Sequence, residues 1–281
     1  MSLDIKKIYV DSRFKTSNSN SDSDFSIELP RSFNVTDGVV AHTDDIVIPV
    51  RWTTIDERNP NCYFAVFAGV NVTEFSFTMP TKNYDGIEFA TVLAAKLNEA
   101  VATFTPRPVL SATYDLAQNI LVISLSDSRS ASAKAQSPIT LQIRTDEVLQ
   151  NPPEGANIVR RSDPRTINAI LRTTICTATS ESNPWRCFFE LHPTRNLYLC
   201  SAALASYDTV SNFGNDTIIK QILCAASHNK LLVQMSGSTL DGLNVSKRSL
   251  RYIDFKLVDT SNRIVPLQRK NFSFSNVFGK N

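Results

Sequence analysis

The chain has 281 residues, of which 42% are hydrophobic and 20% are charged, a balance typical of a folded globular protein with a substantial core. Its 29 basic and 27 acidic side chains leave a net charge of +2, so we expect no direct binding of nucleic acid. No stretch approaches the roughly 18 apolar residues of a membrane span. The N-terminal sequence MSLDIKKIYV lacks the apolar run of a secretory signal peptide. We therefore expect neither a membrane span nor secretion through a signal peptide.

Residues 1–24 are expected to form an N-terminal polar arm with a short strand at Ile8–Val10. The run Thr16–Asp24 is rich in Ser, Asn and Asp and shows no hydrophobic periodicity. Within Phe25–Leu29, apolar and polar residues then alternate, which is typical of a strand with one buried face. We expect this strand to end at Pro30, because proline lacks the N–H that a central strand donates. A second strand is predicted at Asp45–Val50.

One long amphipathic helix is predicted near the middle of the chain. Asp85 is a suitable N-cap, and Glu88 follows it at the third helical position, as in a capping box. The apolar residues that share one face of this helix are Phe89, Leu93, Leu97, Val101 and Phe104. A stripe of this kind indicates a face buried in a core.

Strands are predicted on both sides of this helix. Two of them, at residues 62–67 and 73–79, come before it. After it we expect a hairpin of residues 111–115 with 120–125, a polar loop at 126–137 and a strand at 139–143. Asp163 and Pro164 are expected to start a short helix at Arg165–Leu171.

The last hundred residues are dense in predicted strands. These strands fall at residues 188–191, 196–202, 217–225, 231–235, 252–258, 264–267 and 271–278. A spacing of about ten residues between strands predicts a mainly β protein, either a sandwich or a barrel. Because strands gather at both ends of the chain, we expect one β-domain built from residues 25–80 and 186–281. Residues 81–185 would then form a small inserted α+β domain.

No catalytic or metal-binding motif is found in the sequence. The five cysteines have no C-x2-C spacing, and only eight glycines are present, which argues against a glycine-rich phosphate loop. Acidic pairs occur at Asp44–Asp45, Asp56–Glu57 and Asp146–Glu147. Neighbouring residues on a strand point to opposite faces, so such a pair does not converge on a sugar or a calcium ion by itself. We therefore expect no enzymatic activity, no cofactor and no metal site.

Candidate interface residues lie in the polar arm and beside the second strand. Arg13, Phe14, Asp22 and Asp24 belong to the arm, which has few core-forming residues and is suited to lie against a neighbouring subunit. Trp52 follows the second strand, and tryptophan is enriched at interface hot spots. A buried core position is the alternative for Trp52.

Several pieces of the sequence, in this order, resemble the penton (minor capsid) proteins of Maverick/Polinton-type elements, adintoviruses and virophages. The N-terminal pieces are DSRFKT, SDSDFSIELPRSFNV and DDIVIPVRWTTIDERN. They are followed by NYDG at the start of the predicted helix, and then by DPRTINAILR, NLYLCSAAL, GNDTIIKQILCA and LRYIDFKLVDTSNRIVPLQRKNFSFSNVF. The resemblance covers nearly the whole chain, and its specificity comes from the joint order of the pieces.

This resemblance implies a single jelly roll, often with an inserted domain, that forms a homopentamer at the five-fold vertices of an icosahedral capsid. The expected partners are other copies of the chain and a double jelly-roll major capsid protein, and the expected location is the virion. The resemblance brings no catalytic residues with it, and it identifies no host receptor. Length agrees with a single jelly roll, because a double one needs about sixteen strands of 5–6 residues plus loops.

Two other functions remain open from the sequence. The first is a jelly-roll module on a virion surface that binds a receptor or a glycan through the inserted domain. The second is a β-sandwich glycosidase, which needs two convergent carboxylates about 5–10 Å apart. The sequence nominates no such pair.

Overall fold

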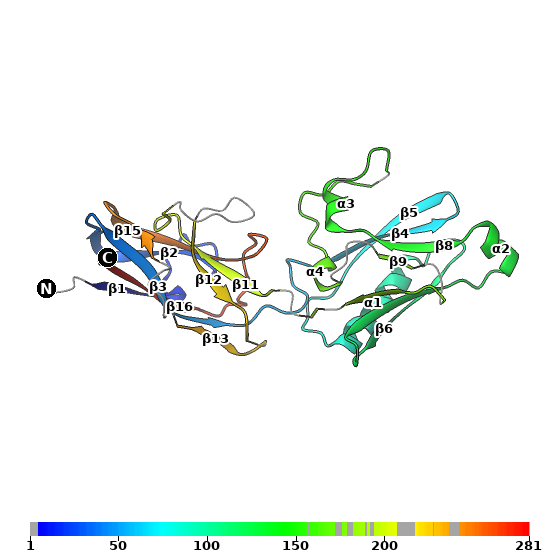
Figure 1. Ribbon diagram of the computed structural model, residues 1–281, viewed down its shortest axis with the longest axis horizontal. Coiled ribbons are helices and arrows are strands. Elements are labelled where there is room, and N and C mark those ends of the chain that lie inside the picture. The colour runs from blue at the N-terminus through cyan, green and yellow to red at the C-terminus, as the bar shows by residue number, and fades with distance from the viewer. Residues whose placement is uncertain are drawn as a thin grey trace. The chain divides into compact units, whose positions relative to one another are not determined.

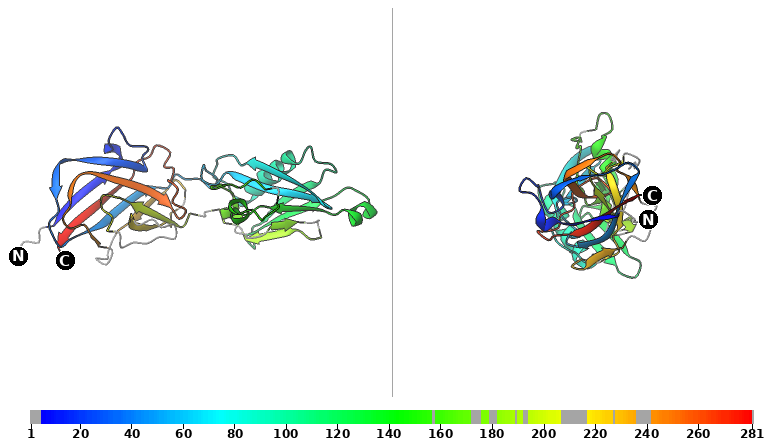
Figure 2. Two further views of the ribbon diagram at one scale, coloured as in Figure 1. Left: turned by 90° about the horizontal axis from the view of Figure 1, so that it is seen from above. Right: turned by 90° about the vertical axis from the view of Figure 1, so that its left-hand side faces the viewer.

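The computed structural model describes residues 5–156, 158–171, 176–178, 182–188, 190–191, 194–206, 217–226, 228–235 and 242–280. The chain divides into two compact units, which we call the sandwich unit and the inserted unit. The sandwich unit consists of Met1–Trp52 and Thr194–Asn281, and the inserted unit is Thr53–Pro193. Each unit is described by itself (Figures 1 and 2).

The sandwich unit contains two antiparallel sheets. The first has the order β1-β16-β3-β13, formed by Lys6–Asp11, Ser273–Lys280, Val39–Pro49 and Leu231–Gln234, and β14 (Leu243–Asn244) also pairs with β3. The second has the order β12-β11-β15-β2, formed by Ile218–Leu223, Asn196–Cys200, Ser249–Asp259 and Asp24–Asn34. The prediction of a mainly β protein is confirmed, and two sheets on one core are compatible with a β-sandwich.

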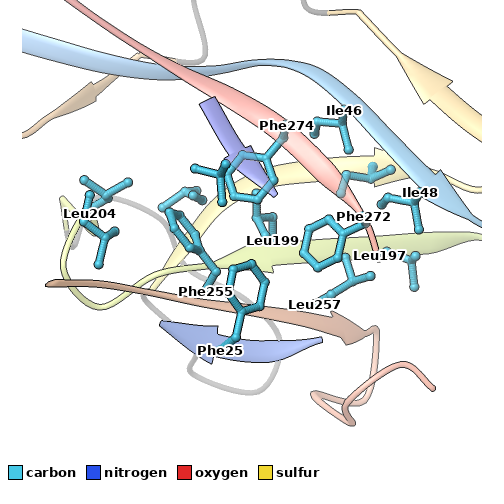
Figure 3. Packing of buried hydrophobic residues seen from close by; sticks show 14 of the residues in the cluster. Phe25, Ile46, Ile48, Leu197, Leu199, Leu204, Phe255, Leu257, Phe272 and Phe274 are labelled. Atoms are coloured by element: carbon cyan, nitrogen blue, oxygen red, sulfur yellow. The ribbon is translucent and has the colours of Figure 1, made fainter. Parts of the chain in front are cut away.

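The core of the sandwich unit is rich in phenylalanine and draws side chains from both sheets (Figure 3). Phe255 on β15 is fully buried, and its ring lies 5.7 Å from that of Phe25 on β2 and 4.8 Å from that of Phe274 on β16. Phe25 and Ile27 are both buried and face this core, as the alternation in the sequence predicts. Aromatic pairs at these separations add stabilisation beyond the area that they bury.

Pro30 does not end its strand. β2 continues through Pro30 to Asn34, and its register against β15 shifts between Tyr252, which pairs with Glu28, and Leu250, which pairs with Phe33. Pro30 therefore lies in a bulge, where a strand tolerates a residue without an N–H donor. The side chain of Arg251 donates to the Pro30 carbonyl oxygen at 3.1 Å and so satisfies a backbone group that the irregular ladder leaves exposed.

The expected arm is instead part of the sandwich unit. Lys6–Asp11 forms the edge strand β1, which pairs with β16 over its whole length. After it, Ser12 donates its N–H to the Phe272 carbonyl oxygen at 3.0 Å and accepts a hydrogen bond from the Phe272 N–H on its hydroxyl at 3.1 Å. Ser23 donates its hydroxyl to the Val265 carbonyl oxygen at 2.6 Å. A polar segment is ordered here because its serines bond to backbone groups of the connection between β15 and β16, far along the chain.

The inserted unit contains two further antiparallel sheets and one long helix. One sheet has the order β5-β4-β8-β9, formed by Asn71–Thr78, Asn61–Ala68, Ile139–Ile143 and Cys176–Ala178. The other has the order β10-β7-β6, formed by Trp185–Phe188, Ile120–Ser126 and Val109–Asp115. The helices are α1 (Gly86–Ala100), α2 (Ala131–Gln136), α3 (Asp146–Gln150) and α4 (Asn168–Leu171). Both sheets and α1 contribute to one shared core.

The boundaries between the units differ from the expected ones at residues 80/81 and 185/186. The strands predicted at 62–67 and 73–79 are β4 and β5, and they pair with each other and with β8 in the inserted unit. Their apolar alternation is the same as that of a sandwich strand, so local sequence does not reveal which sheet they join. The chain changes units at Trp52/Thr53 and at Pro193/Thr194.

The predicted amphipathic helix is confirmed as α1. The Asp85 side chain accepts a hydrogen bond from the Glu88 N–H at 2.8 Å, which satisfies one of the free donors of the first turn. Phe89, Leu93 and Leu97 are fully buried on the predicted face. The helix ends at Ala100, so Phe104 belongs to the following turn, although its ring still packs on Phe75.

Two other local predictions are wrong in part. The short helix α4 begins at Asn168, not at Arg165, because Arg165 has a left-handed backbone with φ of 48° that a helix excludes. The predicted polar loop at residues 126–137 contains the helix α2, capped by the Ser130 hydroxyl, which accepts from the Ala133 N–H at 3.4 Å. The predicted hairpin of residues 111–115 and 120–125 is confirmed as β6 and β7.

Replacing Gly86 with alanine is expected to destabilise the inserted unit by about 1–3 kcal/mol, the usual cost of overpacking. A Cβ on Gly86 would lie 2.3 Å from ring carbons of Tyr114, so the ring has to move. Chemical denaturation of Gly86→Ala measures the loss. In the double variant Gly86→Ala/Tyr114→Ala the added methyl group has room, so its cost should vanish. An equal cost in both backgrounds would contradict this explanation.

Candidate interface surfaces

Four Asp-x-Arg sequences of this protein pair the aspartate with the arginine side chain two residues later. Each carboxylate accepts from the arginine two residues later, and the four pairs are Asp11–Arg13, Asp56–Arg58, Asp127–Arg129 and Asp163–Arg165. In the first three, the arginine backbone N–H also donates to the carboxylate, at 2.9–3.0 Å. The aspartate thus closes a local turn and holds the arginine side chain over it.

The four pairs differ in how far their side chains are buried. The side chains of Asp56 and Arg58 are only 6% and 9% exposed, whereas those of Asp163 and Arg165 are 41% and 53% exposed. Asp56 also donates its N–H to the Asn59 side-chain oxygen at 2.9 Å, and the Asn59 amide donates to the Thr54 carbonyl oxygen at 3.0 Å. The segment 54–59 is therefore a buried polar turn at the start of the inserted unit.

The pair Asp127–Arg129 is expected to make the stability of the inserted unit depend on pH. Hydrogen bonds from the Arg129 guanidinium lower the pKa of Asp127 below the ordinary value. A lowered folded-state pKa contributes stability above the unfolded pKa of about 3.9, and this contribution is lost as pH falls through the folded pKa. Wild type should therefore be more stable than Asp127→Asn at pH 5, and the difference should shrink as pH falls through the folded-state pKa of Asp127. Urea denaturation across this range tests it; a difference that grows in acid would contradict the assignment.

The predicted arm residues lie on or beside the β1 edge of the sandwich unit. Phe14 is 74% exposed, and the Arg13 guanidinium lies 5.8 Å from the centre of its ring. Arg13 also pairs with Asp11, and these hydrogen bonds lower the pKa of Asp11. Tyr9, which the sequence interpretation did not single out, is 78% exposed on β1 itself. The structure thus brings Arg13, Phe14 and Tyr9 to one edge strand and the turn that follows it.

The two arm aspartates serve the chain's own fold. Asp22 pairs with the Lys15 ammonium group. Asp24 accepts from the Asn20 side-chain amide at 2.8 Å, and the Asp24 carbonyl oxygen accepts from the Ser21 N–H at 3.0 Å. Both carboxylates therefore fold the connection between β1 and β2.

Trp52 is buried in the core of the sandwich unit, which is the alternative that the sequence left open. Its carbonyl oxygen lies 3.1 Å from the Nδ1 of His228, next to the point where the chain passes into the inserted unit. The ring is therefore not available as a surface anchor on this chain. Trp185 is buried in the core of the inserted unit.

A second exposed apolar set lies at the opposite edge of the same sheet. On β13, Leu232 is buried, whereas Leu231 and Val233 point outward and are 62% and 60% exposed. Met235 continues this row and is 77% exposed. Sequence reasoning identified the strand but not this surface, because two apolar faces on one strand predict full burial.

The acidic pairs considered as possible catalytic groups have other partners in the structure. Asp44 and Asp45 accept from the Lys7 ammonium group at 3.0 and 3.5 Å, and this pairing lowers the pKa of Asp44. Asp146 accepts from the Thr166 hydroxyl and from the Asn168 amide. Within the described ranges, no group of three or more His, Cys, Asp or Glu side chains is placed to hold a metal ion.

Two cysteine thiols of the inserted unit lie deep in its core. Burial raises the pKa of Cys62 above its ordinary value and raises that of Cys187 to about 12. Both thiols are therefore protonated at neutral pH, which makes them poor nucleophiles and poor metal ligands. They pack as small apolar side chains.

None of the helices in the described part of the chain has the length and apolar character to cross a membrane. The sequence matches no protein-family model, and its comparison with curated proteins finds no match.

Proposed function

We propose that this protein is a structural virion protein, a penton (minor capsid) protein with a single jelly-roll domain. The strand order of the sandwich unit is the observation that carries this proposal. If β13 and β14 count as one interrupted strand, the described residues of the unit form eight strands, ordered 1-8-3-6 in one sheet and 2-7-4-5 in the other. A jelly roll has this order. Its two Greek keys place strands from the start of the domain beside strands from its end in both sheets.

The position of the inserted unit also supports the proposal. It interrupts the sandwich unit between the third and fourth of the eight strands, β3 and β11. The resemblance described above implies a jelly roll that often carries such an insertion. The inserted unit has its own core, so it adds a second folded body without disturbing the first.

In the proposed role, five copies of the chain close a ring at a capsid vertex beside a double jelly-roll major capsid protein. Such a ring is made of head-to-tail contacts, in which two different surfaces of each copy meet. The small net charge of +2 limits repulsion between copies that are packed together. The function is assembly, with no reaction step assigned to any residue.

Electron microscopy and mass measurement of the purified full-length chain test this proposal. We expect rings with five-fold symmetry and a mass five times that of one chain. Co-expression with a double jelly-roll major capsid protein should place these rings at particle vertices. A chain that stays monomeric at high concentration, or that forms a closed dimer, would overturn the proposal. A monomer retained on a glycan surface would favour the glycan-binding module instead.

A further inference from the structure

We propose that copies of this chain join through the two opposite edges of one sheet, with the β13 row of one copy packed on the β1 edge of the next. The β13 row is Leu231, Val233 and Met235, and the β1 edge set is Tyr9 and Phe14. This inference rests on the proposed assembly into rings and adds the surfaces that meet. The occupant of each edge is a second copy of the chain.

The two sets lie at the two ends of a single sheet. In the order β1-β16-β3-β13, β1 and β13 are the terminal strands (Figure 1). Val10 on β1 and Leu232 on β13 are buried in the sandwich core, so their neighbours Tyr9 and Val233 point to the outer face. Each copy thus presents two separate apolar surfaces that cannot both be covered by one small partner.

The edges also present backbone groups for pairing. Among the described residues, β1 pairs only with β16 and β13 pairs only with β3, so one side of each strand has no neighbouring strand. An exposed edge strand with apolar side chains is a template for association with another chain. Charged residues that would oppose such association are absent from the outward row at Leu231, Val233 and Met235.

Hydrogen bonds to β12 of the same unit hold the β13 edge in place. The Gln234 side chain accepts from the Leu223 N–H at 3.2 Å and donates to the Gln221 carbonyl oxygen at 3.4 Å. Gln234 thereby connects β13 to β12, the terminal strand of the other sheet. The Leu223 side chain, at the end of β12, is itself 61% exposed. A surface held in this way loses little conformational freedom when a second copy binds.

Charges around the β1 edge set are compatible with the uncharged β13 row. Lys7 pairs with Asp44 and Asp45, Arg13 pairs with Asp11, and Lys15 pairs with Asp22. Lys7, Arg13 and Lys15 therefore already have carboxylate partners within the chain, and the Lys6 ammonium group lies 4.9 Å from the centre of the Phe33 ring. An uncharged row packed here leaves these ion pairs intact, whereas a charged partner would compete with them.

The opposite placement of the two sets identifies a second copy as the occupant. A cyclic assembly needs two non-overlapping surfaces on each copy, because every copy contacts one neighbour on each side. An isologous dimer would need only one surface. Aromatic side chains on one edge and aliphatic side chains on the other also match the composition of interface cores.

Two surface variants test the pairing. Variant A is Leu231→Asp/Val233→Asp, which places two charges in the β13 row, and variant B is Tyr9→Asp/Phe14→Asp, which replaces the β1 edge set. We expect wild type to assemble and each variant alone to be monomeric in mass photometry and analytical ultracentrifugation. An equimolar mixture should form a complex of one A and one B, because A keeps its β1 edge and B keeps its β13 row.

The controls separate loss of contact from loss of folding. In a Trp185→Phe background, fluorescence of Trp52, which is buried in the sandwich core, should report a folded sandwich unit with a cooperative unfolding transition in both A and B. If an aspartate variant fails to fold, Leu231→Thr/Val233→Thr and Tyr9→Thr/Phe14→Ser replace A and B. The matched control Val70→Asp/Leu116→Asp changes two residues of the inserted unit that are 94% and 77% exposed, and it should assemble like wild type.

The outcomes show separately whether the ring assembly is wrong and whether the edge contact is wrong. If wild type is monomeric, both the assembly and its surfaces are wrong. If wild type forms rings and variants A and B form them equally well, only the edge contact is wrong. If A and B are folded monomers that do not recombine when mixed, or if the control variant also dissociates, the head-to-tail pairing of these two edges is wrong.

Discussion

Replacing Phe255 with alanine is expected to lower the free energy of unfolding of the sandwich unit by about 3–5 kcal/mol, the usual cost of removing a buried phenylalanine ring. Phe255 has no exposed surface and lies between Phe25 of its own sheet and Phe274 of the other. Its removal leaves a cavity where the two sheets meet (Figure 3). Because a typical domain is stable by only about 5–15 kcal/mol, this change should remove a large share of the stability of the unit.

Each unit has one tryptophan in its core, so the unfolding of one unit can be measured separately from that of the other. Trp52 lies in the core of the sandwich unit and Trp185 in that of the inserted unit, and the chain has no other tryptophan. In a Trp185→Phe background, urea denaturation followed by fluorescence reports the sandwich unit. Tyr252→Ala is the matched control, since Tyr252 is on the same strand but 59% exposed. Equal losses for Phe255→Ala and Tyr252→Ala would contradict the assignment of Phe255 to the core.

Replacing Asp56 with asparagine is expected to destabilise the inserted unit by about 3–5 kcal/mol, because it removes one partner of a buried ion pair. The Arg58 guanidinium donates to Asp56 through Nε and Nη2 at 2.7–3.2 Å, and both side chains are buried. Asparagine keeps the size of the side chain but removes the buried negative charge that faces the Arg58 guanidinium. A Trp52→Phe background with Trp185 as the reporter measures the loss.

Asp163→Asn is the matched control for this prediction. Asp163 and Arg165 have the same sequence spacing as Asp56 and Arg58, but both of their side chains are exposed to solvent. An exposed ion pair of this kind contributes no more than about 1 kcal/mol, since water competes for both charges. Similar losses for Asp56→Asn and Asp163→Asn would show that burial does not set the strength of these turns.

Deletion of residues 2–22 would not test an intersubunit contact of the predicted arm. The deletion removes the edge strand β1 and Ser12, which bonds to Phe272. It should therefore destabilise the sandwich unit itself, and loss of assembly would not identify an intersubunit contact. Substitutions at the exposed Tyr9 and Phe14 leave the strand in place and test the contact directly.

The sequence predicts a helix or strand well where residues close together in the chain determine it. The helix α1 begins where Asp85 accepts from the Glu88 N–H, and its buried face is the predicted stripe. The hairpin of β6 and β7 and the alternation at Phe25 and Ile27 are likewise local. The strand end predicted at Pro30 is wrong, because a strand can continue through a proline where its pairing with the neighbouring strand is irregular. Here that neighbour is β15, a strand more than 200 residues later.

By itself, the sequence determined that the protein is mainly β, that a helical segment lies inside it, and where most strands fall. Periodicity carries this information because a strand can be recognised from the alternation of apolar and polar residues within its own segment. Only the tertiary structure decided that β4 and β5 belong to the inserted unit, that Trp52 is buried, and that the strand Lys6–Asp11 pairs with β16 at the edge of a sheet. The physical reason is that strand partners, burial and sheet edges depend on contacts between residues far apart in the chain. The pairing of two apolar edges that we propose became visible only when β1 and β13 were placed at opposite ends of one sheet.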